Sequence, residues 1–166
     1  MFTIRDYNKN DADKILSWIT DEKSFRQWSA DKYKIYPITA DDMNAFYSSI
    51  SRDSAKQYMF CDDGKAIGHF VLRPDPDGDE RSIRLGFIIV DSSVRGKGYG
   101  KAMLQKALEL AFSEGMAERV TLGVFENNPN ALRCYESVGF RRFGSTVYKI
   151  GDEQWVCFEM ECPKNR

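Results

Sequence analysis

The sequence has few of the residues that build metal centres and disulfide frameworks. It contains one histidine, His69, and four cysteines, none of which belongs to a C-x-x-C pair. Without such a cluster of ligands, the sequence indicates no metal site. The simplest interpretation of Cys61, Cys134, Cys157 and Cys162 is that they are reduced thiols, as in a cytoplasmic protein.

Strong net charge and long hydrophobic runs are also missing. The chain carries 24 Lys and Arg against 25 Asp and Glu, a formal net charge of −1, so we expect no general attraction to nucleic acid or to an anionic membrane. No hydrophobic stretch approaches the length that spans a bilayer, and the N-terminus lacks the pattern of a signal peptide. The 166 residues are enough to bury a core, and we expect one domain, 1–166, in a cytoplasmic monomer or homodimer.

The most informative stretch is a glycine-rich loop between an expected strand and an expected helix. An apolar, β-branched run ends at Asp91, the loop carries Gly96, Gly98 and Gly100, and a helical pattern follows. Unpaired N–H groups and the positive end of the helix dipole face outward at such a helix start. Glycines let successive N–H groups converge on one anion, so the loop predicts a phosphate site. Three side chains add positive charge: Arg95, Lys97 and Lys101.

The glycine spacing excludes two common phosphate-binding motifs. A Walker loop ending at Lys101 would need a glycine at position 95 and a Ser or Thr at position 102, where the chain has Arg95 and Ala102. This also disfavours a nucleotide-phosphate hydrolase. A dinucleotide fingerprint starting at Gly96 would need a glycine at position 101. What remains is R-G-K-G-Y-G over residues 95–100.

This pattern resembles the pyrophosphate loop of the GNAT superfamily of acyl-CoA N-acyltransferases, which has the form Q/R-x-x-G-x-G/A between a strand and a helix. A second stretch, residues 128–140, resembles the other signature of that family, N-x-x-A-x-x-x-Y-x-x-x-G-F, and matches each fixed letter. One expected helix and one expected strand separate the two motifs, as in the family. The resemblance covers roughly residues 57–150, and residues 1–56 fit the family's opening in outline.

Hydrophobic periodicity predicts an alternation of strands and helices along the chain. The expected strands are 2–7, 57–61, 66–72, 81–90, 119–125, 140–149 and 153–160, and the expected helices begin near Asn10, Asp21, Thr39, Gly98 and Asn128. This order predicts an α+β protein with a mixed, mostly antiparallel central sheet of about seven strands and helices on its faces. The GNAT resemblance further implies helices on both faces and a splay between the fourth and fifth strands.

Local signals predict several element ends. Thr39 and Asp42 have the spacing of a capping box, and Asp63 with Gly64 is typical of a hairpin turn. The long helix over 98–114 should end at Gly115. Asn128 followed by Pro129 is typical of an N-cap and first helical position.

The resemblance implies acetyl-CoA as cosubstrate. In the family, a bulge splays the strand before the loop and exposes an edge for the pantetheine arm. Gly86 lies just upstream and would ease such a bulge. A main-chain N–H of this strand would polarise the thioester carbonyl. The implied cofactor-binding residues are Ile88, Ile89, Val90, Arg95, Gly96, Lys97, Gly98, Tyr99, Gly100, Lys101, Asn128 and Tyr135.

Tyr135 is the residue to which the resemblance assigns catalysis. The family places a tyrosine four residues before the G-F pair, where it protonates the CoA thiolate. A phenol with a pKa of about 10 can donate a proton to a developing thiolate. The alternative is that Tyr135 only packs, because Ala131 and Val138 lie on the same helical face.

The residue that deprotonates the amine is not identified by the sequence. Some family members place a glutamate on the strand before the second motif, but residues 122–124 hold none, and Glu126 is the nearest carboxylate. His69 is expected to be a satisfied core or edge side chain. Cys134 lies about 100° around the helix from Tyr135, which disfavours an acyl-cysteine route. Three aromatic residues either line an acceptor pocket or belong to the core: Trp18, Trp28 and Tyr36.

The sequence therefore predicts an N-acetyltransferase that acts by direct transfer. The acceptor would be a primary amine on a protein N-terminus, a lysine or a small molecule. The alternative is a non-catalytic acyl-CoA-binding regulatory module. Neither the motifs nor the net charge chooses among the acceptors.

Overall fold

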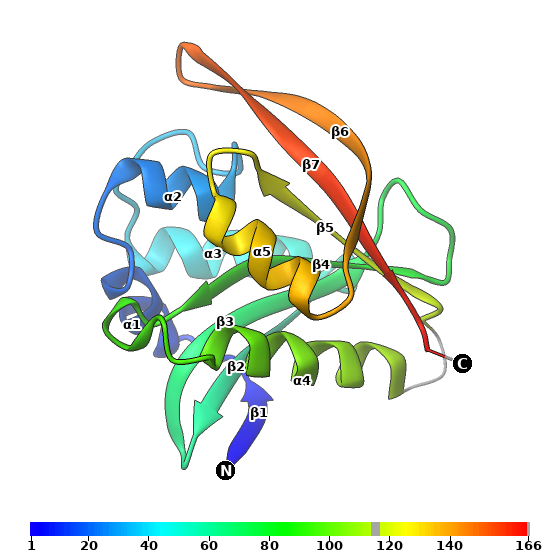
Figure 1. Cartoon of the computed structure of the whole chain (residues 1–166). Coiled ribbons are helices and arrows are strands. Elements are labelled where there is room, and N and C mark those ends of the chain that lie inside the picture. Colours follow the sequence, from blue (N-terminus) through cyan, green and yellow to red (C-terminus); the bar gives the residue numbers. More distant parts are fainter. Residues whose placement is uncertain (114–116, 166) are drawn as a thin grey trace.

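The structure, a computed structural model, describes residues 1–113 and 117–165. Seven strands and five α-helices lie within these residues, in the order expected from the sequence (Figure 1). The strands are β1 (Phe2–Asp6), β2 (Lys56–Asp62), β3 (Lys65–Pro74), β4 (Ser82–Val90), β5 (Arg119–Phe125), β6 (Arg141–Ile150) and β7 (Glu153–Pro163). The helices are α1 (Asp11–Ser17), α2 (Glu22–Ser29), α3 (Ala40–Ser51), α4 (Tyr99–Ser113) and α5 (Pro129–Ser137), and a 3-10 turn (Ser92–Val94) precedes α4.

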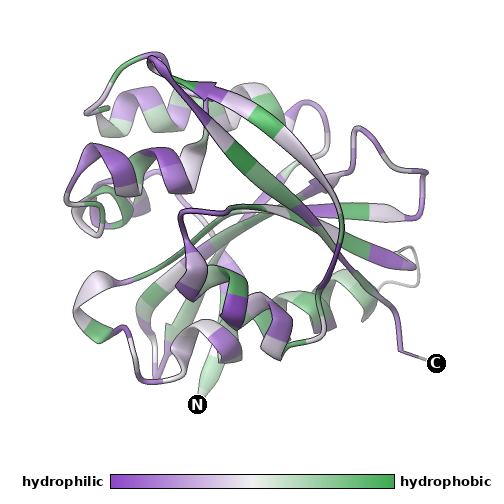
Figure 2. Cartoon of the chain, turned by 45° about the horizontal axis from the view of Figure 1, so that its top comes forward, coloured by the Kyte–Doolittle hydropathy of each residue, from purple (hydrophilic) through white to green (hydrophobic). Residues whose placement is uncertain are grey.

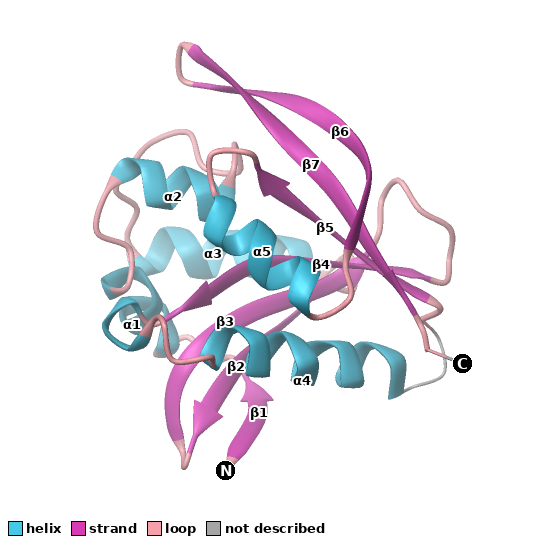
Figure 3. Cartoon of the chain, in the orientation of Figure 1, coloured by secondary structure: helices cyan, strands magenta, loops and turns pink. Residues whose placement is uncertain are grey.

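The strands form one mixed sheet in the order β1-β2-β3-β4-β5-β7-β6. β4 and β5 pair in parallel, and the other neighbouring pairs are antiparallel, which confirms the predicted sheet. The β2–β3 hairpin turns at Asp63 and Gly64, which have positive φ angles of 47° and 83°, as expected. Figure 3 shows the β6–β7 hairpin extending beyond the rest of the sheet.

The sheet opens at its parallel pair. Residues 82–84 of β4 pair with residues 119–121 of β5, and the register ends there, although both strands continue. The predicted splay between the fourth and fifth strands is therefore confirmed. Residues 86–90 of β4 remain paired with β3 along one edge. Along the other edge, which faces β5, they pair with no strand that the structure describes.

Helices cover both faces of this sheet. The core beneath α4 and α5 includes Met103, Leu122 and Met160, and the core beneath α1, α2 and α3 includes Ile15 and Met59; all five are fully buried. In Figure 2 the helices carry both hydrophobic and hydrophilic residues. Each helix can therefore bury one side against the sheet and expose the other to water.

The predicted helix starts are borne out in part. The Thr39 hydroxyl accepts the Asp42 N–H (3.1 Å), and the Asp42 carboxylate accepts the Thr39 N–H (2.9 Å), which confirms the capping box. Asn128 is the N-cap of α5 and Pro129 follows it, but the Asn128 side chain makes no capping hydrogen bond. That part of the expectation is wrong. Gly115, predicted to end the long helix, lies outside the described residues.

A bulge in β4 turns the open edge. His69 of β3 pairs with Ile89, and Val71 pairs with Gly86, so two β4 residues stand opposite one β3 residue. Phe87 within the bulge has a φ of +50°, a conformation that is costly for a bulky residue. The strain thus falls one residue after Gly86, the residue that the sequence indicated. Three rings, from Trp28, Phe46 and Tyr47, lie 5.3 to 5.8 Å from the Phe87 ring and hold it in place.

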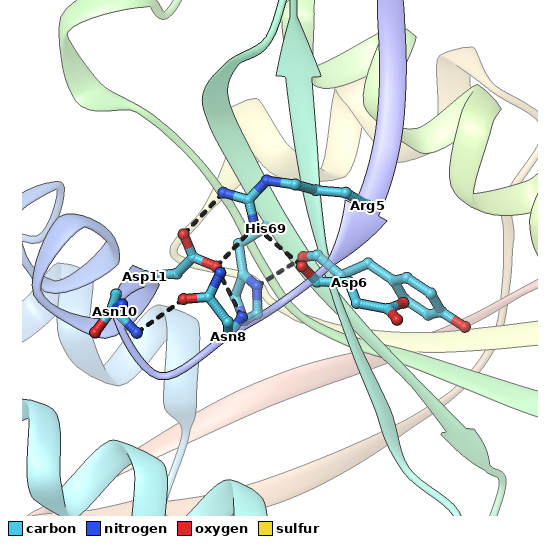
Figure 4. A network of polar contacts seen from close by, with 7 residues as sticks. Arg5, Asp6, Asn8, Asn10, Asp11 and His69 are labelled. Atoms are coloured by element: carbon cyan, nitrogen blue, oxygen red, sulfur yellow. Dashed lines mark hydrogen bonds and ion pairs between the residues drawn. The ribbon is translucent and has the colours of Figure 1, made fainter.

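His69 is a fully buried core residue with both ring nitrogens paired, as expected. Nδ1 lies 2.8 Å from the Tyr58 carbonyl oxygen, and Nε2 lies 2.7 Å from the Tyr47 hydroxyl. Because a carbonyl only accepts, Nδ1 carries the proton and Tyr47 donates to Nε2. Burial lowers the pKa of His69 to about 4. Figure 4 shows His69 near Asp11, whose carboxylate accepts two hydrogen bonds from Arg5, at 2.9 and 2.8 Å.

The neutral state of His69 predicts a pH-dependent stability. Unfolding restores a pKa near 6.5, so between pH 6.5 and about 4 the unfolded chain binds more protons than the folded chain. His69 should therefore cost the folded state about 3 kcal/mol as pH falls through this window, with no further loss below it. Urea unfolding of wild type and His69→Gln from pH 4 to 7 measures this. An equally steep pH dependence in the variant would contradict the assignment.

Candidate active site

A cavity of about 630 Å³ lies where the splayed end of β4 meets the starts of α4 and α5. Its volume is within the range of small-molecule sites. The end of α1 and one side of α2 close it with Trp18, Ile19, Ser24, Gln27 and Trp28, and Gly123 and Val124 of β5 complete the wall. The cavity therefore joins elements that are far apart in the chain, from Trp18 to Tyr135.

The residues predicted to bind the cofactor lie together in this cavity. Its lining contains Ile88, Ile89, Val90, Arg95, Gly96, Gly98, Tyr99, Gly100, Lys101, Asn128 and Tyr135. Lys97 is exposed and does not line it. The two motifs, about 30 residues apart in the chain, thus face one space.

The glycine loop has the geometry of an anion cradle. Gly96 and Gly98 have φ angles of +80° and +83°, in the left-handed region that glycine adopts without strain. The Ala102 N–H closes the first turn of α4 on the Gly98 carbonyl (3.1 Å), so the preceding N–H groups are free to bind a ligand. The Arg95 Nε donates to the Val90 carbonyl (3.2 Å), which fixes the loop against the end of β4.

Tyr135 of α5 is 8% exposed and lines the cavity. Its ring packs on Phe140, with a centroid distance of 6.2 Å, so the packing role left open by the sequence is real. Burial raises the pKa of Tyr135, which keeps the phenol protonated near neutral pH. Its hydroxyl makes no hydrogen bond to any residue that the structure describes. The side chain is thus packed through its ring and has a free proton donor.

Cys134, the neighbour of Tyr135, also lines the cavity. Burial raises the pKa of its thiol, although the Lys101 cation opposes this. A protonated thiol is a poor nucleophile. The raised pKa gives no support to an acyl-cysteine route, which the sequence also disfavours.

Asn128 and Gln27 are amide side chains at the end of the cavity nearest α2. Asn128 lacks the capping bond described above, so none of the described N–H groups of α5 occupies its amide oxygen. The Gln27 Nε2 donates to the backbone oxygen and the side-chain Oδ1 of Asn127, at 3.2 and 3.1 Å. This contact ties α2 to the start of α5. The sequence gave no signal for Gln27 because its partner lies 100 residues away.

Two of the three candidate aromatic residues for the acceptor pocket reach the cavity. Trp18 and Trp28 line it. Tyr36 does not, and its ring instead lies 5.0 Å from that of Phe25. The side of the cavity formed by α1 and α2 therefore carries two indole rings beside Ile19, Ser24 and Gln27.

No carboxylate or imidazole belongs to the described lining of the cavity. Glu126 is exposed beyond the end of β5 and is not part of the wall. A carboxylate does lie behind the wall at Gly123, because a Cβ placed there would sit 3.0 Å from the Glu159 Oε2. Across residues 1–113 and 117–165, no group of three His, Cys, Asp or Glu side chains could hold a metal ion.

Similarity to known proteins identifies the family. The profile of the acetyltransferase (GNAT) family matches residues 15–140, well over half of the chain. The chain belongs to the GNAT family. As a GNAT acetyltransferase it uses acetyl-CoA as its cosubstrate. Among its described helices, none is both long and apolar enough to cross a bilayer.

Relatives of this GNAT acetyltransferase include enzymes named for small amines. Aminoglycoside N(6')-acetyltransferase type 1 of Klebsiella pneumoniae is 24% identical over 90% of this chain and 78% of its own length. Spermine/spermidine N(1)-acetyltransferase of Bacillus subtilis is 32% identical over 48% of this chain and 55% of its own. A structure of AAC(6')-Ib in complex with ribostamycin and coenzyme A shares the fold, with a TM-score of 0.81, 19% identity and coverage of 98% and 93%.

The close approach of side chains to Gly123 predicts that an alanine there destabilises the protein more than an alanine at Gly86. A methyl group at Gly123 would lie 2.8 Å from the Cys157 Sγ and 2.9 Å from an Arg84 nitrogen. Gly123→Ala should therefore lower the free energy of unfolding by about 1–3 kcal/mol. Gly86→Ala, where a Cβ meets nothing within 4 Å, should change it by less than about 1 kcal/mol. Equal losses of unfolding free energy for the two variants in chemical denaturation would contradict the close packing at Gly123.

Proposed function

We propose that this chain transfers an acetyl group from acetyl-CoA to the primary amine of a small molecule by direct attack. The observation that carries the proposal is one cavity in which an open strand edge, a glycine turn at a helix start and a buried phenol meet. Bound acetyl-CoA supplies the activated acyl group. The residues of this chain bind it, orient it and move protons.

The cavity fits the parts of coenzyme A. Free N–H groups at Gly98 to Lys101 suit its pyrophosphate, and Arg95 and Lys101 are the charged side chains in the described lining. The open edge of β4 suits the amides of the pantetheine arm, which can add to it as a strand would. The bulge at Phe87 turns this edge, so a main-chain N–H there can hydrogen-bond to the thioester oxygen.

Tyr135 is the proposed proton donor to the leaving thiolate. Its raised pKa keeps the proton available, and its hydroxyl has no competing partner among the described residues. Because the raised pKa makes this phenol a weaker acid than a free tyrosine, it gives up the proton only as negative charge develops on the sulfur, and CoA leaves as the thiol. The ring contact with Phe140 holds the donor in place.

The proton of the attacking amine has a different route. Because the described wall holds no carboxylate or imidazole, we infer that this proton passes to water. The same feature would suit a non-catalytic acyl-CoA-binding module, which needs no base. Turnover of any amine decides against that alternative.

The acceptor is proposed to be a small amine rather than a protein. Relatives are named for aminoglycosides and for spermine and spermidine, and Trp18 and Trp28 line the same cavity as the proposed cofactor-binding residues. A pocket favours a small ligand over an extended surface.

Binding of acetyl-CoA at the glycine turn can be tested with two matched glycines. Acetyl-CoA at a hundred times its dissociation constant should stabilise the wild type by about 2.7 kcal/mol. Gly98→Val should abolish this shift, because valine does not tolerate a φ of +83° at the turn. Gly64→Val is the control, since Gly64 has the same φ in a hairpin outside the cavity and this variant should keep the shift. If Gly98→Val binds acetyl-CoA as the wild type does, the glycine turn is not the binding site for its pyrophosphate.

The role of Tyr135 can be separated from its packing. Tyr135→Phe keeps the ring and removes the proton donor, so kcat should fall by about 100-fold or more while the Kd for acetyl-CoA changes much less. Tyr7→Phe, outside the cavity lining, controls for loss of a tyrosine hydroxyl. Steady-state kinetics with acetyl-CoA titration measure both. Parallel losses of kcat and affinity would show that Tyr135 is structural.

A further inference from the structure

Two arginines lie side by side near the open edge of β4. Arg73 of β3 and Arg84 of β4 are register partners, so their side chains leave the same face of the sheet. Arg84 forms a two-point ion pair with Glu159 of β7, with distances of 3.0 and 3.3 Å. Arg73 is half-buried, and it makes no hydrogen bond or ion pair with any residue that the structure describes.

Asp75 and Asp77, the acidic side chains closest in sequence to Arg73, attract its positive charge, but burial and the Arg84 cation outweigh them. The Asp75 carboxylate accepts the Thr121 hydroxyl (2.6 Å) and the Asp77 N–H (3.0 Å). Neither Asp75 nor Asp77 forms an ion pair with Arg73 within the described residues. Burial and the neighbouring Arg84 cation lower the pKa of the Arg73 guanidinium. Arg73 is thus a desolvated donor that an arriving anion would stabilise.

An open space lies beside this pair. Gly86 is two residues from Arg84, so its missing side chain would project from the same face. A Cβ at Gly86 would meet nothing within 4 Å, whereas one at Gly123 would meet Arg84 and Glu159. Gly123 also lines the cavity. Arg84 therefore adjoins the cavity at Gly123, and Arg73 lies beside Arg84, outside the described lining.

The charges around the cavity favour an anionic acceptor over a polycation. Its described wall on the α1 and α2 side is aromatic and amide-bearing, and no carboxylate is present to bind a second ammonium group. Glu159, behind the wall at Gly123, is already paired with Arg84. The unpaired cation at Arg73 is the complementary feature. A guanidinium binds a carboxylate through two parallel hydrogen bonds.

We propose that the acceptor amine also carries a carboxylate, as an amino acid does, and that Arg73 binds this carboxylate. The proposal rests on the proposed acetyl transfer and names its substrate class. This class differs from the aminoglycosides and spermine for which two relatives are named, and it is the class for which another relative, L-amino acid N-acetyltransferase AaaT of Escherichia coli, is named. In this arrangement Arg73 determines specificity, while Arg84 keeps Glu159 from neutralising it.

Matched acceptors test the carboxylate directly. Amino acids, their carboxamides and the corresponding decarboxylated amines are compared by release of CoA. The wild type should show a kcat/KM about 10- to 100-fold higher for the acid than for either neutral-headed partner, the range expected for a charge-assisted hydrogen bond. Equal values, or higher values for spermine, would overturn the proposal.

Variants then assign the preference to Arg73. Arg73→Gln should bring the ratio of acid to carboxamide close to one, and Arg73→Lys should restore part of it. Arg81→Gln, which removes an exposed arginine just before β4, should keep the wild-type ratio. Thermal melting of Arg73→Gln should match or exceed that of the wild type. A wild-type ratio or a lower melting temperature in Arg73→Gln would show that Arg73 is structural.

Different results would contradict the acetyl transfer and the role of Arg73. Absence of stabilisation by acetyl-CoA, or of turnover with every amine, would contradict the acetyl transfer itself. Stabilisation by acetyl-CoA with turnover that ignores the carboxylate would leave the transfer standing and remove only the role of Arg73. If Arg73→Gln fails to fold, the wild-type comparison of matched acceptors still decides.

Discussion

The parallel pairing of β4 with β5 stops after three residues, and the site is built around that stop. A strand that loses its neighbour leaves donors and acceptors unpaired, which is costly unless water or a ligand meets them. Here the unpaired stretch faces a cavity of ligand size. The same interruption that weakens the sheet therefore creates a place where an extended amide chain can bind.

The surrounding packing keeps the two strands apart. On one face, α4 and α5 fill the space with apolar side chains. On the other, the Arg84–Glu159 pair crosses β5 at Gly123, where no side chain separates them. Below the opening, residues 82–84 still bind residues 119–121 and fix the vertex of the splay. The cavity is thus held open from three sides.

The sequence predicted the parts of the site that depend on local backbone geometry. The glycine loop and the segment from Asn128 to Phe140 carry their own turn and helix signals, so both were found with their elements. Long-range contacts were not predictable in this way. Gln27 meets Asn127 across 100 residues. Among the described residues Arg73 has no ion-pair partner, because Glu159 of β7 pairs with Arg84 instead. The strain at Phe87 was also missed, because packing rather than residue type imposes it.

Phe87 has a wider consequence for how such a site can diversify. Its ring is wedged among side chains of α2 and α3, while its main chain belongs to the bulge that turns the β4 edge. The helices beside the acceptor pocket and the edge proposed for the pantetheine arm therefore share one residue. Substitutions in α2 and α3 that change the preferred amine must therefore keep the position of the Phe87 ring. If the ring moves, the β4 edge moves with it, and the thioester loses its alignment.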